Sequence, residues 1–235
     1  MSMSQRLNLL AIDSFSSVLS VAVCRADEIH YAQTDARTKH SELVMDMIDS
    51  LMKKASLGPN DLDGVLCMGG PGSFTGLRIG FSIAKGLALS LSVPFAPVPT
   101  LDCMAFPCRQ RALVLAAVEA RKNTFFYAFY RGGERLKPQA LVEEDARAEQ
   151  IALEIQRYNE KVTLTGAGAS SLYGLLPREA AQNVEPDLQS RGYARELIAI
   201  AKMSKTFEND NTAFLYSGPE YARKTDAELN LSARL

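Results

Sequence analysis

The chain has 235 residues, a formal net charge of −1 and a pI of about 6.2. Hydrophobic residues make up 47% of it and charged residues 23%, which is typical of a globular protein with a sizeable core. Proteins that bind nucleic acid on their own usually carry a basic excess or a basic face. The near-neutral balance therefore argues against an autonomous nucleic-acid-binding protein.

Cysteine usage and the apolar runs favour a cytoplasmic location. The four cysteines form no Cys-x-x-Cys pair, and the N-terminus lacks the charged-then-apolar layout of a signal peptide. The longest apolar stretch, Ile79–Val98, is interrupted by polar residues and by Pro94, which indicates a helix and a strand rather than a membrane span. We expect reduced thiols and no membrane partner.

The first half of the chain alternates compact apolar runs with amphipathic segments. Apolar and β-branched runs predict strands, and apolar rows at i, i+4 predict helices. The predicted order is strands at Leu7–Asp13, Val18–Arg25 and Ile29–Thr34, a helix over Ser41–Lys54, a strand at Val65–Met68, a loop over Gly69–Gly76, a helix over Leu77–Leu91, a strand in Pro94–Pro99 and a short helix near Leu101–Phe106.

The second half repeats this succession. The predicted order is strands at Ala112–Glu119 and Thr124–Arg131, a helix over Glu144–Tyr158, a strand at Val162–Thr165, a glycine loop at Gly166–Gly168, a helix from Ser170 and a last helix over Tyr193–Thr206. Two apolar strands that end in an acid, at Asp13 and at Glu119, align together with the strands that follow them. We interpret this succession as an internal duplication.

A duplicated βββαβα unit predicts an α/β protein with the actin-like ATPase (ribonuclease H-like) fold. We expect an N-terminal subdomain over residues 1–107 and a C-terminal subdomain, including the last helix, over residues 108–235. A shared fold says little about activity, so function has to be argued from particular residues.

The segment Gly69–Gly80, with the sequence GGPGSFTGLRIG, follows a strand and starts a helix. Backbone N–H groups at a helix start suit an anion, but no lysine follows the glycines as it does in a P-loop. The segment is therefore either a weak anion or nucleotide site or a tight turn packed against neighbouring backbone. The candidate residues for the anion site are Asp13, Gly70, Gly72, Ser73, Arg78 and Gly168.

The helix after this loop carries small residues at Gly76, Gly80, Ala84 and Ala88, spaced by four. A helix that is apolar nearly all round has to be buried on more than one side. The small row lets another element approach closely. The sequence pattern leaves open whether that element belongs to this chain or to another subunit.

Asp13 and His40 are the remaining candidates for chemistry. Asp13 is either a cleft acid, as in a phosphotransferase, or an acid that stabilises the strand end, and the turn after it contains no glycine. His40 lacks a second histidine four residues later, where Val44 stands, so no metal-binding pair is predicted. A surface or helix-capping role is expected for His40, and no catalytic residue is assigned.

These segments together resemble the TsaB (YeaZ) family of bacteria. The resemblance rests on LLAIDSFSSVLSVAV, on GGPGSFTGLRIGFSIAKGLAL and on PFAPVPTLDCMA in the first half. VEARKNTFFYAFY and Leu215–Arg223 resemble the family more loosely. The string G-P-G-S-F-T-G-x-R-I-G is the most specific of these features.

The resemblance implies a non-catalytic, dimerising subunit of the complex that forms N6-threonylcarbamoyladenosine beside the anticodon of tRNAs reading ANN codons. Its implied partners are a TsaD-like catalytic subunit, a TsaE-like ATPase, tRNA reached through the complex, and a second copy of itself when isolated. The complex uses ATP, whereas this chain is expected to need no cofactor. The implied subunit interface consists of His40, Leu43, Val44, Met47, Ile48, Leu51, Gly76, Gly80, Ile83, Ala84 and Leu87.

Two other functions compete with this interpretation. A metallopeptidase would need metal ligands, and the residue four positions after His40 is Val44. A stand-alone nucleotide-dependent phosphotransferase would need Asp13 and the glycine loops to face a bound nucleotide.

Overall fold

A computed structural model of the chain describes residues 7–36, 39–136, 145–207 and 218. The described residues divide into two compact units. The first contains residues 7–107 and returns at 189–207, and the second contains residues 108–188. Among the described residues, no helix combines the length and the apolar character needed to span a membrane.

The first unit is built on a mixed sheet whose strand order is β3-β2-β1-β4-β5. Strands β3, β2 and β1 pair antiparallel, whereas β1, β4 and β5 pair parallel. The central strands are buried along their length, as their continuous apolar runs predict. The strands are β1 (Leu9–Asp13), β2 (Val18–Arg25), β3 (Glu28–Asp35), β4 (Gly64–Gly70) and β5 (Phe95–Pro99).

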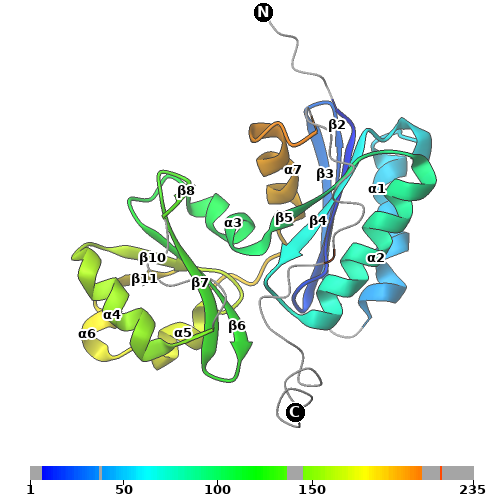
Figure 1. The fold of residues 1–235 in the computed structure, drawn as a ribbon. Helices are drawn as coiled ribbons and strands as arrows, with labels where there is room; N and C mark the ends of the chain where they lie inside the picture. The colour runs from blue at the N-terminus through cyan, green and yellow to red at the C-terminus, as the bar shows by residue number, and fades with distance from the viewer. Residues whose placement is uncertain (1–6, 37–38, 137–144, 208–217, 219–235) are drawn as a thin grey trace, which may run out of the picture. The chain divides into compact units, whose positions relative to one another are not determined.

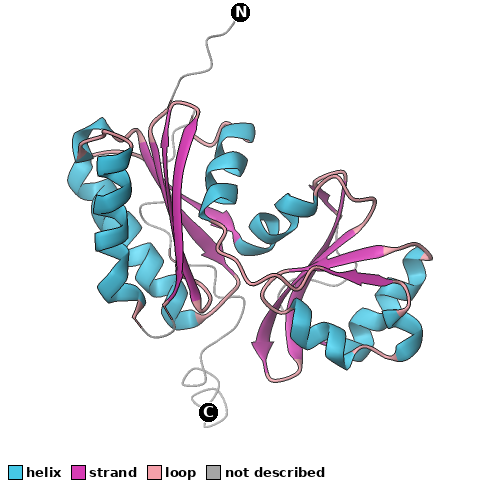
Figure 2. Ribbon diagram, turned by 180° about the vertical axis from the view of Figure 1, so that it is seen from behind, coloured by secondary structure: helices cyan, strands magenta, loops and turns pink. Residues whose placement is uncertain are grey.

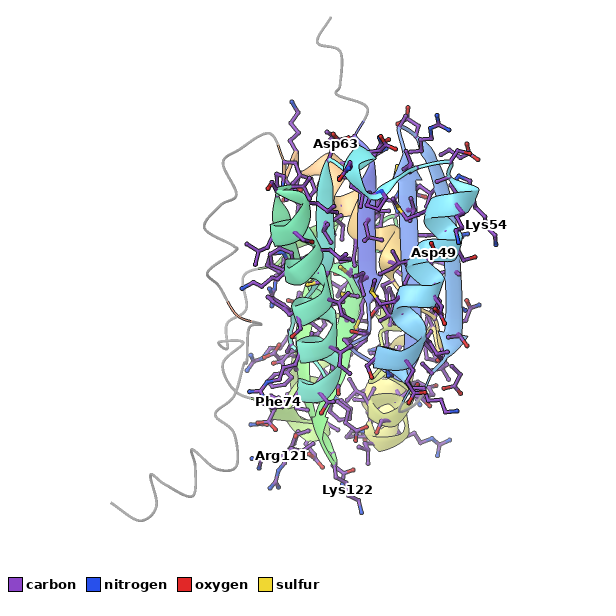
Figure 3. The ribbon with its side chains drawn as sticks, turned by 90° about the vertical axis from the view of Figure 1, so that its right-hand side faces the viewer. Asp49, Lys54, Asp63, Phe74, Arg121 and Lys122 are labelled. Carbon is purple, nitrogen blue, oxygen red and sulfur yellow. The ribbon has the colours of Figure 1, made fainter. Side chains whose placement is uncertain are left out.

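Helices cover both faces of this sheet (Figures 1 and 2). Helices α1 (His40–Lys54) and α2 (Phe74–Leu91) lie side by side on one face, as Figure 3 shows from their solvent side. Helices α7 (Ala194–Met203) and α3 (Thr100–Ala105) pack on the other. Short 3₁₀ turns at Pro59–Asp61 and Phe106–Cys108 complete the connections.

The second unit repeats the pattern around a sheet of order β11-β10-β6-β7-β8. Helices α4 and α5 bury their apolar residues with those of the sheet. The strands are β6 (Val114–Arg121), β7 (Thr124–Arg131), β8 (Glu134–Arg135), β10 (Val162–Thr165) and β11 (Val184–Pro186), with β9 (Ala146–Arg147) pairing β7. The helices are α4 (Ala148–Tyr158), α5 (Ala169–Leu175) and α6 (Arg178–Ala181).

The two sheets have the same topology, three antiparallel strands followed by two parallel ones. This order, with helical crossovers between the parallel strands, defines the actin-like ATPase (ribonuclease H-like) fold twice over. The predicted fold class and the predicted internal duplication are therefore confirmed.

Several predicted boundaries differ from the structure. The predicted subdomain 108–235 does not contain the last helix, because α7 packs on the first sheet. The glycine loop is only Pro71–Ser73, since β4 runs to Gly70 and α2 already begins at Phe74. Helix α4 begins at Ala148 rather than at Glu144. Glu144 and, apart from Gly218, the segment Leu215–Arg223 lie outside the described residues.

Helix α2 lies against the turn that follows β1 because it presents glycine there. A Cβ atom added to Gly76 would lie 2.2 Å from the carbonyl oxygen of Ser14, and one added to Gly80 would lie 2.7 Å from Ser14 Oγ. The Ser14 hydroxyl donates a hydrogen bond of 2.8 Å to the carbonyl of Gly76. The small-residue row therefore packs within the first unit, with Ala84 and Ala88 buried beyond it.

This close approach predicts opposite effects of alanine at two glycines of one helix. Gly76→Ala forces backbone apart and should lower the free energy of unfolding by about 2 kcal/mol or more. Gly86→Ala meets nothing within 4 Å and should raise it by about 0.5–1 kcal/mol, because alanine favours the helix. Urea denaturation of both variants checks this, and equal effects would contradict it.

Candidate functional site

Two N–H groups of the glycine segment have partners inside the protein. The N–H of Gly70 donates to Thr100 Oγ1 at 3.2 Å, and that of Gly76 donates to the N-cap residue Ser73 at 3.3 Å. A Cβ atom added to Gly72 would lie 2.9 Å from the ring of Phe15. The predicted tight turn packed on neighbouring backbone is the alternative that this geometry supports.

The remaining anion candidates are also engaged. The Arg78 guanidinium lies 3.7 Å from the centroid of the Phe74 ring, at the start of α2. In the second unit, the N–H of Gly168 donates to the carbonyl of Ala117 at 2.9 Å. A Cβ atom added to Gly168 would lie 2.7 Å from the backbone nitrogen of Glu119. The absence of a side chain at Gly168 thus serves close helix–strand packing.

Asp13, at the end of β1, is fully buried and accepts three hydrogen bonds. The donors are Phe15 N at 3.3 Å, Ser20 Oγ at 3.2 Å and Tyr193 N at 2.7 Å. Burial raises the pKa of this carboxyl to about 7, although its backbone donors act in the opposite direction. The structure therefore gives Asp13 a structural role at a strand end, the second of the two predicted alternatives.

Asp13 belongs to a polar cluster on the face of the first sheet that α7 covers. Ser20 Oγ accepts from Ala194 N at 3.1 Å, and Gln33 Oε1 accepts from Gly192 N at 3.0 Å. The Tyr31 hydroxyl lies 3.0 Å from the carbonyl oxygen of Gly192 and 2.5 Å from Gln33 Oε1. We call Asp13, Ser20, Tyr31 and Gln33 the α7 clasp.

Sequence reasoning missed three members of the clasp, Ser20, Tyr31 and Gln33. They lie on β2 and β3, about 160 to 174 residues before the backbone groups that they bind. No local pattern marks such a contact. The only available indication was the acid at the end of an apolar strand.

His40 is buried, so the first of the two predicted alternatives for it, a surface position, is wrong. Its Nε2 lies 2.8 Å from the carbonyl oxygen of Ser16, so this nitrogen carries the proton and donates. The neighbouring Val44 is fully buried in the core. Among the described residues, no group of three or more metal-ligating side chains comes together.

The predicted interface residues fall into two groups. Partial exposure is found only for Leu43 and Met47 on α1 and for Ile83 and Leu87 on α2. The others are buried within the first unit and cannot present side chains to a partner in this folded state; they are His40, Val44, Ile48, Leu51, Gly76, Gly80 and Ala84.

Helices α1 and α2 also expose apolar side chains that were not predicted. Met45 on α1 is 47% exposed, and Phe74 and Leu89 on α2 are 38% and 60% exposed. Phe74 lies at the N-terminal end of α2 in Figure 3. Exposed apolar side chains on two adjacent helices are candidates for a protein–protein contact.

Comparison with known proteins agrees with the duplicated fold. Residues 28–231 match the family model described as "TsaD: tRNA N6-adenosine threonylcarbamoyltransferase". The tRNA threonylcarbamoyladenosine biosynthesis protein TsaB of Haemophilus influenzae is 38% identical over 128 residues, which are 53% of this chain and 54% of that protein. The chain thus spans about half the length of this curated relative.

Two solved structures from Pseudomonas aeruginosa show the same fold. An uncharacterized protein with similarity to peptidase YEAZ has a TM-score of 0.78 at 22% identity, covering 92% of this chain and 100% of that one. YeaZ has a TM-score of 0.74 at 21% identity, covering 93% and 99%.

The duplicated sheet topology and the match to the family model define a duplicated actin-like protein of the class that the TsaD family model describes. Within that class, the chain belongs to the TsaB (YeaZ) family.

The buried carboxyl predicts a pH-dependent stability. The pKa of Asp13 in the folded state, about 7, exceeds its ordinary value of 3.8. As pH rises, Asp13 therefore loses its proton at a lower pH in the unfolded chain than in the folded protein. Asp13 should therefore lower the free energy of unfolding as pH rises from about 4 to about 7, by at most about 1.4 kcal/mol per pH unit.

Asp13→Asn removes this titration. The difference in unfolding free energy between wild type and variant should shift in favour of the variant as pH rises, and then level off above pH 7. Urea denaturation at pH 5, 6, 7 and 8 measures the difference, and parallel profiles would contradict the assignment.

Proposed function

We propose that this chain is a cytoplasmic, non-catalytic subunit in the formation of N6-threonylcarbamoyladenosine on tRNA, and that it acts by binding a TsaD-like catalytic subunit. The observation that carries the proposal is the family membership, supported by a match that runs from residue 28 to residue 231. The relatives named TsaB are described as biosynthesis proteins of this modified nucleoside.

The surroundings of His40 support a role without catalysis. A metal-binding pair on this helix would need a second ligand near position 44, and Val44 there is a core residue with no exposed surface. His40 is itself committed to the carbonyl of Ser16. Among the residues that the structure describes, the metallopeptidase alternative therefore finds no ligand set around His40.

The geometry likewise does not favour a stand-alone phosphotransferase. Asp13 is enclosed and accepts three donors of its own chain. The N–H groups of Gly70, Gly76 and Gly168 already donate to protein oxygens. A phosphate at these positions would have to displace each of those bonds.

Partner binding is assigned to the solvent side of α1 and α2. The proposed contact surface consists of the partly exposed Leu43, Met47, Ile83 and Leu87 with the exposed Met45, Phe74 and Leu89. Such a surface could also pair with itself, and we expect the isolated chain to form a homodimer. In the working complex a TsaE-like ATPase would consume the ATP, and tRNA would be reached through the catalytic subunit.

Depletion of the protein from its organism tests the function. We expect the level of N6-threonylcarbamoyladenosine in total tRNA to fall and to recover when the gene is restored. Liquid chromatography with mass spectrometry of tRNA nucleosides measures it. An unchanged level after complete depletion would reject the proposed function.

A charged residue in the proposed contact surface should weaken partner binding. Leu87→Arg and Ile83→Arg each place a charge among apolar contacts and should weaken capture of the TsaD-like protein of the same organism at least about tenfold. Leu153→Arg is the matched control, because Leu153 is 60% exposed on α4 of the second unit.

Circular dichroism verifies that each variant is folded before the pull-down. Wild-type capture by folded Leu87→Arg and Ile83→Arg would reject the surface assignment. That result would not bear on the proposed function, which is tested separately by the measurement of tRNA nucleosides.

A further inference from the structure

The α7 clasp binds three consecutive residues where the chain enters α7. Gln33 accepts a hydrogen bond from the N–H of Gly192, Asp13 accepts one from Tyr193, and Ser20 accepts one from Ala194. The first N–H groups of a helix have no partner within the helix and need caps. The side chain of the N-cap residue, Tyr193, makes no capping hydrogen bond. The sheet therefore supplies the cap of α7.

The entry into α7 fits the sheet closely enough to exclude a side chain at Gly192. A Cβ atom there would lie 2.2 Å from Ser20 Cβ and 2.3 Å from Ser20 Oγ. The next residue, Tyr193, is buried, and its ring lies 6.4 Å from that of Phe15. The start of α7 is thus held on the sheet both by hydrogen bonds and by close packing.

Helix α7 depends on this docking for its own stability. It spans ten residues, from Ala194 to Met203, and an isolated helix shorter than about 12 residues is marginal in water. Leu197, Ile198 and Ala201 are buried against the first sheet. Near its other end, Lys202 Nζ donates to the carbonyl of Ala26 and lies 3.2 Å from Asp27.

We propose that Asp13, Ser20 and Gln33 form a latch that holds α7 on the first sheet, and that opening of this latch releases α7 as one unit while the sheet stays folded. Native proteins open locally in such cooperative units, with free energies below that of global unfolding. The latch is a property of the first unit and does not rest on the proposed function.

The latch responds to protons because its central acceptor is a buried acid. Opening returns Asp13 to water, where its ionised form is favoured, whereas closing excludes water from a buried carboxyl whose three hydrogen-bond donors carry no charge. A rising pH between about 4 and 7 therefore shifts the latch toward the open state. The other titratable groups that interact with Asp13 are Glu196 on α7, Tyr31 on β3, Cys67 on β4 and Cys103 on α3. Arg191 and Arg195 interact in turn with Glu196.

Hydrogen exchange of the full chain, followed by mass spectrometry, tests the latch. Gly192→Ala should lower the protection factors of the α7 amides about tenfold or more, because the new methyl group collides with Ser20. The amides of β1 and β4 should keep their protection. Gly174→Ala is the matched control, since a Cβ atom there meets nothing within 4 Å and α7 protection should not change.

Two further variants keep the test decisive. If Gly192→Ala does not fold, Gln33→Ala removes the acceptor of the Gly192 N–H from an exposed position, and the same selective loss is expected. In Asp13→Asn, the fall in α7 protection between pH 5 and pH 7 that we expect for wild type should disappear. The proposal would be overturned if the α7 amides were as protected as those of β1 and β4 in wild type, in Gly192→Ala and in Gln33→Ala.

Discussion

The first unit depends on one short turn, Asp13–Ser16, onto which four other segments close. Helix α2 reaches it through Gly76 and Gly80, and the loop before α2 reaches it through Gly72. Helix α1 is bound to it by the hydrogen bond between His40 and Ser16, and the start of α7 by that between Tyr193 and Asp13. Backbone groups buried at such a junction need partners, and the segments supply them to one another.

This constraint explains the glycine motif without a ligand. Its glycines leave space for the Ser14 carbonyl and the Phe15 ring, and the N–H groups of Gly70 and Gly76 bind Thr100 and Ser73. The motif thus sets the position of α2 on the sheet, and with it the positions of the exposed apolar side chains of α2. The packed turn thus also positions the part of α2 that belongs to the proposed contact surface.

Much of the fold could be predicted from the sequence, because its strands carry the pattern themselves. The ranges predicted for β2, β7 and β10 are those of the structure, since β-branched and aromatic runs mark them. The start of α2 was placed too late because the Ser73 cap lies inside the glycine run. The clasp and the return of α7 to the first sheet could not be predicted, because they depend on contacts between residues up to 180 positions apart. Burial of Val44 and Ala84 could not be predicted either, because it depends on which helix face packs on the sheet. The apolar pattern alone is compatible with more than one face.

If the glycine segment serves the fold rather than a ligand, the amides of Gly70, Gly76 and Gly168 should be insensitive to nucleotide. Titration of the isotope-labelled protein with magnesium ATP to millimolar concentration, followed by two-dimensional NMR of the backbone amides, measures this directly. We predict that these three amide resonances stay in place throughout the titration. A saturable shift of the Gly70 and Gly76 resonances would show that the segment binds phosphate and would contradict the account.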